Sequence, residues 1–575
     1  MTARRGGPVR ARRAAADQSG AADPAAGRRV VVVGAGIAGL ATAALLARDG
    51  YDVEVLERRE QTGGRCGVWE HDGFMFDTGP SWYLMPEVFD HFFALMGTSA
   101  ARELDLVRLD PAYRVITEGD AAAGRAPLDV RSGTEESAAL FDAVEPGAGV
   151  ALRAYLAEAR EAYELALRRF LYTSFQSLRP LLRRDVLRRT GTLARLLLRP
   201  LDAHVARRFT DPRLRQVLGY PAVFLGTSPD RAPSMYHLMS HLDLADGVLY
   251  PLGGLRTVID AVERLALAAG VRLTTGAEVT AVLTRPGRGD DAVRTSRSGR
   301  AHVTGVEVRD ADGVHLVPAD VVVGAGDLHH LETRLLPEPL QTYPERWWAG
   351  RDPGPGAVLV HLGVRGRLPL AHHTLLFTDD WATNFDAVYG KNPRVPDPAS
   401  MYVCTPSRTD ASVAPADHEN VFLLVPVPAD PADPDATGGA LGRGLGRGGI
   451  DGAGDAAVER VADAAIARLA SWAQIPDLAE RIVLRRTVGP GDFAADLHSW
   501  RGGALGPGHT LRQSAMLRGR NASRHVDGLL YAGGSTIPGV GLPMCLISAE
   551  VAVKRLRGDT STEPLPLPAA VLERT

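Results

Sequence analysis

A glycine-rich turn between two apolar segments restricts the fold of this chain more than any other feature. Four consecutive valines at 30–33 precede Gly34, Gly36 and Gly39, and an alanine- and leucine-rich stretch follows at 40–47. In such a strand–turn–helix unit the first glycine permits a tight turn, the second lets a phosphate approach the backbone, and the third allows the helix to pack on the strand. The helix N-terminus adds free N–H groups and a partial positive charge. The segment therefore predicts a binding site for the pyrophosphate of a dinucleotide.

An acidic residue ends the next predicted strand, as a dinucleotide site requires. Glu57 lies 18 residues after the third glycine of the turn, where a carboxylate can accept hydrogen bonds from the ribose hydroxyls of adenosine. Gly64 and Arg65 follow, and after them comes the turn Gly79-Pro80-Ser81. NAD enzymes need nothing of this kind, whereas in flavoproteins such an arginine can bind the pyrophosphate and ribitol region. We therefore expect the cofactor to be FAD rather than NAD.

A second strand–turn–helix pattern lies near residue 540. A strand-like run at 529–534 leads into a turn rich in glycine and proline, and a helical pattern continues from Cys545 to Leu556. The backbone amides at the start of that helix can face the flavin ring or the pyrophosphate, because the helix dipole is positive there. The candidate cofactor-binding residues of this segment are Gly534, Ser535, Gly541, Leu542 and Met544.

Strand-like and helical patterns alternate along the rest of the chain, which indicates an α/β protein. Runs of β-branched residues predict strands at 30–33, 53–56, 321–323, 358–362, 421–427 and 529–532. Apolar periodicity predicts helices at 152–170, 184–209, 255–269, 456–473 and 548–556. Two tracts, 285–299 and 429–456, are rich in charged residues, proline or glycine and are expected to be surface insertions. Because similar glycine turns occur near both ends, the first and last segments are expected to share a domain.

Composition excludes several classes of protein. An apolar fraction of 45%, a charged fraction of 23% and a net charge of -3 are those of an ordinary globular protein, with no indication of nucleic-acid binding. Three cysteines lie far apart without metal-ligand spacing. The histidine pairs His329-His330 and His372-His373 are expected to point to opposite faces of a strand, so no metal site is predicted. The first 28 residues lack the apolar core of a secretory signal, which predicts a disordered tail and a cytoplasmic protein.

With these motifs in view, the chain resembles the bacterial carotenoid desaturases, and most closely the phytoene desaturases. The resemblance covers roughly residues 28–557. It is carried by the glycine turn and by the segments at 73–79, 109–115, 228–255, 371–377, 401–410 and 533–550.

The resemblance implies an α/β fold in which a Rossmann-like FAD-binding domain, of the amine oxidase and GDI type, is interleaved with a mixed α+β substrate domain and a helical segment that faces the membrane. The FAD-binding domain is expected at 29–115, 241–340 and 486–560. The helical membrane-facing part of the substrate domain is expected at 116–240 and the remainder at 341–485, with a loop insertion at 429–456 and tails at 1–28 and 561–575.

The resemblance also assigns site residues. The FAD motif of the family matches Gly34, Gly36, Gly39, Glu57, Gly64, Arg65 and the Gly79-Pro80-Ser81 turn. Val279 matches the position whose backbone meets the adenine, and the segment from Gly534 to Met544 matches the flavin side. One departure concerns the substrate region, because many relatives have aspartate where this chain has Pro180 after Arg179. An Arg-Asp pair acting on substrate is therefore not expected there.

The implied activity is desaturation of an acyclic carotene, from phytoene to neurosporene or lycopene, by hydride transfer to flavin, with quinone or oxygen as the final electron acceptor. A hydrocarbon offers no group to deprotonate or polarise, and the chain contains neither GxSxG nor HExxH. No catalytic residue is identified. The alternatives are a desaturase of another acyclic terpenoid, such as dehydrosqualene or a hydroxylated carotene, a carotene ketolase, an amine oxidase, or a non-catalytic prenyl-binding escort protein.

A basic segment suggests how such an enzyme could reach an apolar substrate. Thirteen arginines between Arg168 and Arg215 stand against three aspartates and are interspersed with leucines. Arginine near anionic lipid contributes about 1 kcal/mol per residue. We expect the enzyme to dock peripherally on the inner face of the cell membrane through this segment. A solvated basic helix face is the alternative interpretation.

Overall fold

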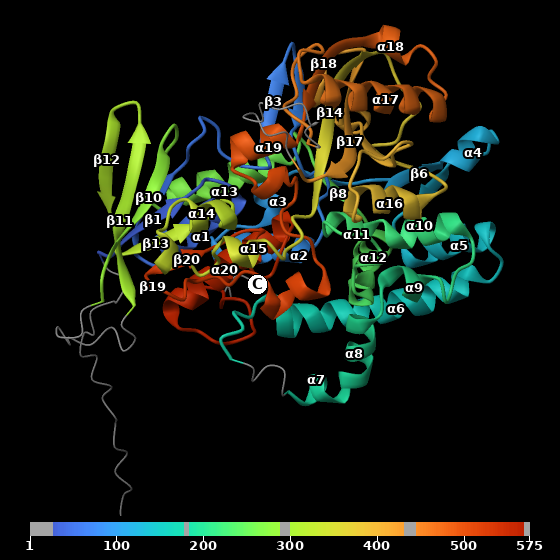
Figure 1. The fold of residues 1–575 in the computed structure, drawn as a ribbon. Helices are drawn as coiled ribbons and strands as arrows, with labels where there is room; N and C mark the ends of the chain where they lie inside the picture. Colours follow the sequence, from blue (N-terminus) through green and yellow to red (C-terminus); the bar gives the residue numbers. More distant parts are fainter. Residues whose placement is uncertain (1–26, 178–182, 288–299, 431–443, 569–575) are drawn as a thin grey trace, which may run out of the picture.

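A five-stranded parallel sheet brings together segments from the beginning, middle and end of the chain. The computed structural model describes residues 27–177, 183–287, 300–430 and 444–568 (Figure 1). The sheet order is β20-β13-β1-β2-β9, and every neighbouring pair is parallel. Its strands are β1 (Arg29–Val33), β2 (Asp52–Leu56), β9 (Arg272–Thr274), β13 (Val321–Gly324) and β20 (Leu529–Tyr531). Strands from the first and last segments of the chain therefore lie in one sheet.

Side chains alternate along these strands, so each face of the sheet contributes to a different core. Val30 and Val32 pack with three helices, α1 (Ile37–Arg48), α13 (Arg256–Ala268) and α20 (Leu542–Arg557). On the opposite face, Val31 and Val322 pack with the antiparallel strands β10 (Glu278–Arg285), β11 (Ala301–Asp310) and β12 (Gly313–Pro318) and with α14 (Leu328–Thr333). Covered on both faces, β1, β13 and β20 are largely apolar, as buried parallel strands usually are, whereas β2 and the edge strand β9 also contain polar residues.

The contact of α1 with the turn before it depends on glycine. Gly34 adopts a left-handed backbone with φ of 101°. A Cβ atom at Gly39 would overlap the carbonyl oxygen of Gly34 and lie 3.1 Å from the Cβ of Ala325. The third glycine of the motif is therefore required by close packing, as the sequence predicts.

A seven-stranded sheet forms the second part of the molecule, in the order β18-β14-β17-β16-β15-β6-β7. All pairs are antiparallel except β15 with β6. The strands are β6 (Tyr113–Thr117), β7 (Leu128–Val130), β14 (Pro355–Arg365), β15 (His373–Phe377), β16 (Met401–Cys404), β17 (His418–Pro428) and β18 (Ile482–Val488). β6 and β18 cross the domain boundaries expected at residues 115 and 485, because both pair within this sheet.

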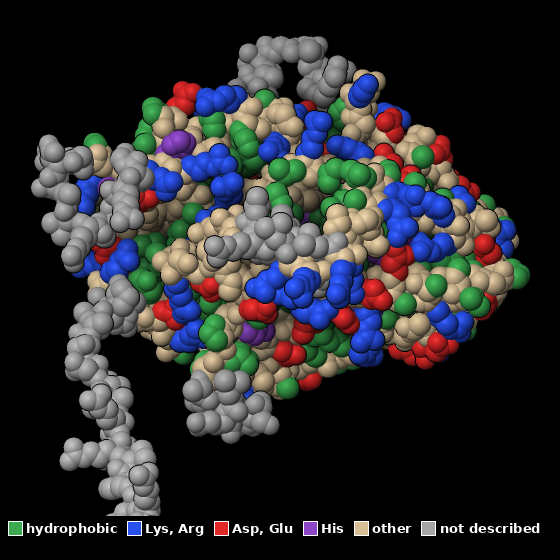
Figure 2. Space-filling view, turned by 90° about the horizontal axis from the view of Figure 1, so that it is seen from below, with side chains coloured by type: hydrophobic (Ala, Val, Ile, Leu, Met, Phe, Trp, Pro, Cys, Tyr) green, Lys and Arg blue, Asp and Glu red, His purple; other side chains and the backbone are tan. Residues whose placement is uncertain are grey.

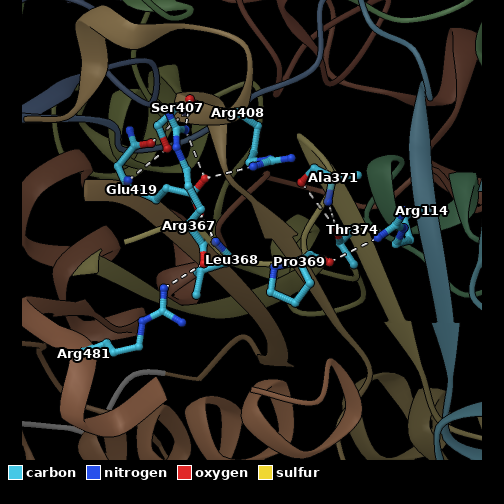
Figure 3. A network of polar contacts seen from close by, with 11 residues as sticks. Arg114, Arg367, Leu368, Pro369, Ala371, Thr374, Ser407, Arg408, Glu419 and Arg481 are labelled. Carbon is cyan, nitrogen blue, oxygen red and sulfur yellow. Dashed lines mark hydrogen bonds and ion pairs between the residues drawn. The ribbon is translucent and has the colours of Figure 1, made fainter. Parts of the chain in front are cut away.

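A buried carboxylate organises the connection from β14 to β15 (Figure 3). Glu419 of β17 is fully buried and accepts hydrogen bonds from the backbone N–H of Leu368, at 2.8 Å, and from the guanidinium of Arg367, at 3.3 Å. Arg408 approaches the same carboxylate at 3.5 Å. Arg481 donates to the carbonyl oxygen of Arg367 from the other side. These contacts hold the connection against the end of the sheet.

A helical region lies below the second sheet in Figure 1. It contains α5 (Thr134–Val144), α6 (Ala148–Ala166), α9 (Leu201–Val205), α10 (Pro212–Gly219), α11 (Pro221–Phe224) and α12 (Met239–His241), and α7 (Arg184–Arg188) and α8 (Thr190–Leu198) project from its lower edge. The single helix predicted over 184–209 is wrong. Arg199 has extended backbone angles, because the proline that follows it disfavours the helical region. This residue separates α8 from α9, and a second break at Arg189 separates α7 from α8.

The remaining elements connect these units. They are β3 (Val68–His71), β4 (Phe74–Asp77), α2 (Pro86–Leu95), α3 (Ala100–Glu103), β5 (Leu106–Arg108), α4 (Glu118–Ala122), β8 (Leu249–Pro251), α15 (Glu345–Trp348), α16 (Trp381–Tyr389), α17 (Ala456–Trp472), α18 (Leu478–Arg481), α19 (Pro490–Leu497) and β19 (Val526–Asp527).

Part of the predicted insertion at 429–456 pairs with the second sheet. Residues 431–443 lie outside the described part of the chain, as do the tail at 1–26, most of the tract at 285–299 and the departure at Pro180. Residues 444–455, however, pack along β18. Ile450 forms a bridge with Arg486, and the N–H of Thr487 donates to the carbonyl oxygen of Gly449. The tract thus extends the edge of the second sheet.

The glycine contact in α1 generates a stability prediction. Gly39→Ala should lower the free energy of unfolding by about 3 kcal/mol or more, because the added methyl group forces α1 away from its turn. Thermal or urea unfolding measures the change. The matched control is Gly191→Ala in α8, where no heavy atom lies within 4 Å of the new Cβ. It should be neutral or stabilise by about 0.5–1 kcal/mol. Equal effects of the two substitutions would contradict the packing argument.

Candidate dinucleotide site

The predicted cofactor residues gather at the carboxyl ends of the parallel strands, the edge where open α/β sheets bind ligands. Gly34 follows β1, Glu57 follows β2, Ala325 follows β13 and Ala532 follows β20. Backbone hydrogen bonds continue the sheet into these turns, from Ala325 to the carbonyl of Val33 and from Ala532 to that of the last residue of β13. The turns from both ends of the chain are therefore held side by side.

Glu57 is fixed beside the glycine turn. Its side chain is buried, with 8% of the residue exposed. One carboxylate oxygen accepts from the N–H of Ala35 at 2.7 Å and the other from the N–H of Arg59 at 2.9 Å. Because each oxygen has lone-pair capacity for a further donor, the carboxylate can still accept from ribose hydroxyls. Val279 of β10 lies nearby and packs in the same core as Leu56. Two residues earlier, the N–H of Ala277 donates to the carbonyl of Glu57.

Two side-chain-free backbone segments face each other across the turn. Gly36 forms a parallel bridge with Gly63, and the N–H of Gly63 donates to the carbonyl of Ala35 at 2.9 Å. Gly64 has φ of 58°, and a Cβ atom there would lie 3.5 Å from the Cα of Gly36. The backbone at 36 and 64 is therefore accessible to a group as large as a phosphate only because neither residue has a side chain.

Arg65 joins two segments that are distant in the sequence. Its Nε donates to the carbonyl of Ala504 at 2.9 Å, and Nη2 donates to Oγ of Ser499 at 2.8 Å. The guanidinium also lies close enough to Cys545, in the first turn of α20, to oppose the rise in its thiol pKa that burial causes. Arg65 thus places positive charge beside the start of α20 while holding the 499–504 segment in place.

The turn Gly79-Pro80-Ser81 connects the two sheets. A Cβ atom at Gly79 would overlap the carbonyl oxygen of Arg65, so glycine is required there. Ser81 is buried, and its hydroxyl lies 2.6 Å from the hydroxyl of Tyr402 in β16. The turn therefore extends from the cofactor residues directly to the second sheet.

The C-terminal segment presents a helix N-terminus to the same edge. Gly541 caps α20 with φ of 119°, and its carbonyl accepts from the N–H of Cys545. The N–H groups of Leu542 and Met544 lie in the first turn, where a helix supplies no acceptor for them. Gly534 is held from behind, because Nη2 of Arg518 donates to its carbonyl at 2.6 Å, and Ser535 follows in the same turn.

Sequence reasoning missed a buried histidine that supports this segment. Nε2 of His509 accepts from the N–H of Val540 at 3.2 Å, so its Nδ1 carries the proton and donates to the hydroxyl of Tyr236 at 2.8 Å. Burial lowers the pKa of His509 well below its usual value, which keeps the ring neutral in this arrangement. A Cβ atom at Gly539 would overlap the ring. The one sequence signal was the turn-like run Gly506-Pro507-Gly508 directly before the histidine.

The residues present fit FAD. The pyrophosphate needs an approachable backbone, which the glycines at 34, 36 and 64 provide, and donors, which the first turns of α1 and α20 provide. Gly326, after β13, adds another open position, with no heavy atom within 4 Å of a Cβ built there. The adenosine end would lie at Glu57 and Val279, and the flavin end between Arg65 and the 534–544 segment.

Known proteins provide an independent comparison. Residues 37–437 match the family described as flavin containing amine oxidoreductase. A carotenoid 3,4-desaturase of Haloarcula japonica is 39% identical, over 93% of this chain and 99% of its own length. A zeta-carotene-forming phytoene desaturase of Myxococcus xanthus is 36% identical, over 92% and 94%. A phytoene dehydrogenase of Streptomyces griseus is 34% identical, over 92% and 95%.

Solved structures agree at the level of fold. An oxidoreductase of Methanosarcina mazei superposes with a TM-score of 0.55 at 16% identity and covers 92% of this chain and 100% of that one. A putrescine oxidase variant superposes with a TM-score of 0.53 at 15% identity and covers 96% and 100%. The predicted fold class and the predicted FAD cofactor are confirmed. The chain belongs to the flavin containing amine oxidoreductase family and, within it, to the carotenoid and phytoene desaturases.

Proposed function

We propose that this chain is an FAD-dependent desaturase that introduces double bonds into an acyclic carotene. The observation that carries the proposal is its alignment with carotenoid desaturases along more than nine-tenths of its length, at up to 39% identity. Bound FAD supplies the acceptor for a hydride that leaves an allylic carbon. We propose quinone or oxygen as the final electron acceptor. The geometry of the dinucleotide site supports this assignment, because every element of the FAD motif converges at one sheet edge.

The residues of the chain would hold and shield the reactants. We propose that the second sheet and the helical region form the substrate domain. Trp82, directly after the Gly79-Pro80-Ser81 turn, lies in a cluster of rings with Tyr113, Tyr220 and Phe224, at centroid distances of 5.3–6.2 Å. An apolar aromatic surface next to the cofactor turn suits a polyene, which offers only dispersion and hydrophobic contacts. It would orient the chain of carbons and exclude water.

Two reactions compete for the assignment within this class. The sequence motifs favour desaturation of phytoene, whereas the relative with 39% identity is described as a 3,4-desaturase, and the two phytoene enzymes are 36% and 34% identical. We propose phytoene desaturation as the main candidate. The second candidate is 3,4-desaturation of a carotene with a longer conjugated system.

Pigment analysis tests the proposal. The gene is expressed in one bacterium that accumulates phytoene and in another that accumulates lycopene, and carotenes are separated by liquid chromatography. We expect loss of phytoene and appearance of more conjugated products in the first host. Conversion only in the second host would favour 3,4-desaturation. Gly36→Val, which fills the phosphate side of the turn, should abolish flavin binding and conversion. Gly350→Ala, where no heavy atom lies within 4 Å of the new Cβ, should retain both. Unchanged carotenes in both hosts with flavin-loaded protein would reject the proposal.

We also propose that the enzyme docks peripherally on the inner, cytoplasmic face of the cell membrane. No helix among the described residues is long and apolar enough to cross a membrane. Several arginines of the basic segment pair within the protein, such as Arg208 with Glu158 and Arg213 with Asp211. The exposed basic side chains concentrate on α7 and α8 and at the residues that flank them, at Arg183, Arg184, Arg188, Arg189 and Arg195.

Apolar side chains accompany these arginines. Leu198 is 74% exposed and Leu197 is 39% exposed. Figure 2, which views the end of the molecule from which α7 and α8 project, shows basic side chains gathered together with hydrophobic ones among them. Exposed leucines inside a basic patch suit insertion between anionic headgroups better than a purely solvated face.

Co-sedimentation with vesicles tests the docking surface. Charge reversal of Arg183, Arg184, Arg188 and Arg189 to Glu should weaken binding to phosphatidylglycerol vesicles at least about tenfold, since each arginine contributes roughly 1 kcal/mol. High salt should weaken wild-type binding as well. Leu198→Ser should weaken it without changing the salt dependence. The control is Arg346→Glu, which is 80% exposed on α15. Vesicle binding that changes neither with salt concentration nor with any of these substitutions would contradict the proposed docking surface.

A buried acid in the proposed substrate domain generates a pH prediction. Asp243 accepts hydrogen bonds from the hydroxyls of Tyr220 at 2.6 Å and Tyr113 at 3.2 Å. Burial raises its pKa to about 7. Between about pH 4 and 7 the unfolded chain therefore loses a proton that the folded chain keeps. The free energy of unfolding consequently falls as pH rises through this window.

Asp243→Asn removes this titration and keeps an acceptor for the tyrosines. The stability of the variant relative to wild type should increase by about 2–3 kcal/mol between pH 5 and pH 8. Thermal unfolding at several pH values measures the difference. Glu338→Gln, whose side chain is 79% exposed, is the control and should show no such trend. A difference that does not change with pH would show that Asp243 is ionised in the folded protein throughout.

A further inference from the structure

Two groups of metal-ligand side chains lie outside the dinucleotide site in the described part of the chain. One contains Glu158, His204 and His237, and the other contains His372, His373 and Cys404. In the first group the guanidinium of Arg208 donates to Glu158 and lies 2.8 Å from Nε2 of His204, so a cation already occupies it. The second group contains no such cation.

The second group is a buried cluster of two imidazoles and a thiol. Its candidate donor atoms all lie within 4.8 Å of one another, and the three residues are between 0% and 5% exposed. His373 begins β15 and pairs in register with Cys404, the last residue of β16. The prediction that His372 and His373 point to opposite faces of a strand is wrong. His372 precedes the strand, so the alternation does not apply, and the two ring centroids are 4.5 Å apart.

The hydrogen bonds of both imidazoles leave one nitrogen of each available. Nδ1 of His372 lies 2.8 Å from the hydroxyl of Thr409, and Nδ1 of His373 lies 2.7 Å from the hydroxyl of Tyr402. Nε2 of each ring is buried and has no hydrogen-bond partner. A buried nitrogen without a partner is costly, whereas an imidazole with one nitrogen oriented by a hydrogen bond and the other free is typical of a metal ligand.

The backbone that presents these ligands is held rigidly. Figure 3 shows the connection from Arg367 to Thr374, in which the N–H of Leu368 donates to Glu419 and Arg114 donates to the carbonyl of Pro369 at 3.1 Å. On the other strand, the N–H of Thr405 donates to the carbonyl of His372. The ligands are therefore positioned by the sheet and its polar network before any ion binds.

The charge around the cluster suits a divalent cation. Asp410 acts electrostatically on His372, and Asp77 acts on Cys404. The thiolate formed on binding and the two nearby carboxylates would offset the charge of the ion.

We propose that His372, His373 and Cys404 bind one zinc ion through two imidazole nitrogens and one thiolate sulfur. Mixed nitrogen and sulfur donors select zinc over the hard cations that prefer oxygen. Donors around tetrahedral zinc lie about 3.4–3.6 Å apart, so binding draws these side chains inward by at most about 1.4 Å. The Cys404 thiol gives up its proton to solvent, and a water molecule completes the coordination. The site connects β15 and β16 and, through Tyr402 and Ser81, the cofactor turn.

Metal analysis of the full-length, flavin-loaded protein tests the proposal. Protein from zinc-supplemented cells is dialysed, and zinc is measured per chain by mass spectrometry. We expect about one equivalent in wild type and less than about one-fifth of that in His372→Gln and Cys404→Ala, since each loses one of three protein ligands. The control is His361→Gln, because His361 is another buried histidine of the second sheet with both nitrogens unpaired, yet lies outside the cluster. It should keep its zinc.

X-ray absorption of the wild-type protein provides a test that does not depend on how the variants fold. The zinc spectrum should contain one sulfur at about 2.3 Å and nitrogens at about 2.0–2.1 Å. Folded, flavin-loaded wild type that retains no zinc would overturn the proposal. So would a spectrum without sulfur, a different metal in stoichiometric amount, or equal loss of zinc in the His361 control.

Discussion

The close approach of backbone to backbone around the glycine turn is the constraint on which the rest of the structure depends. Helix α1 can lie on its strand only because residue 39 has no side chain to collide with the carbonyl of Gly34. The same absence of side chains at Gly36 and Gly64 leaves the sheet edge open. Glu57 then fixes the turn by accepting the N–H of Ala35. Close packing, missing side chains and one buried hydrogen bond thus define a small region. Strands from the beginning, middle and end of the chain all end there.

The elements with a strong local signal could be predicted from the sequence. The valine runs at 30–33 and 321–323 became central parallel strands, because a strand covered on both faces has no polar positions to interrupt the pattern. The residues of the FAD motif also lie together, because this spacing of glycines is typical of one strand–turn–helix geometry and of few others. The single helix predicted over 184–209 was wrong. Leucine and arginine favour helix throughout, and the proline at 200 separates α8 from α9. The break at Arg189, between α7 and α8, has no such local signal.

The contacts that the sequence did not indicate are long-range. His509 supports the residue before Gly541 from a loop more than thirty positions away, and a histidine in a glycine-rich loop has no characteristic spacing to its partner. Cys404 and His373 meet because β15 and β16 pair in register, which depends on the whole seven-stranded sheet. Strand alternation mispredicts the directions of His372 and His373, because His372 precedes the first residue of β15. In each case the missing information was tertiary, and local propensity could not supply it.

The order of strands in the parallel sheet has a consequence for the synthesis of the protein. β20 and α20 complete the edge at which Glu57 and the glycine turn lie, yet the ribosome makes them after the other four strands. Until then the apolar side chains of α1 that face α20 have no cover. Pairing of β20 with β13, between residues such as Val322 and Leu529, is also slow, because a long loop must close before the strand contacts form. The nascent chain therefore exposes an incomplete, aggregation-prone core for most of translation, and chaperones have a long interval in which to engage it.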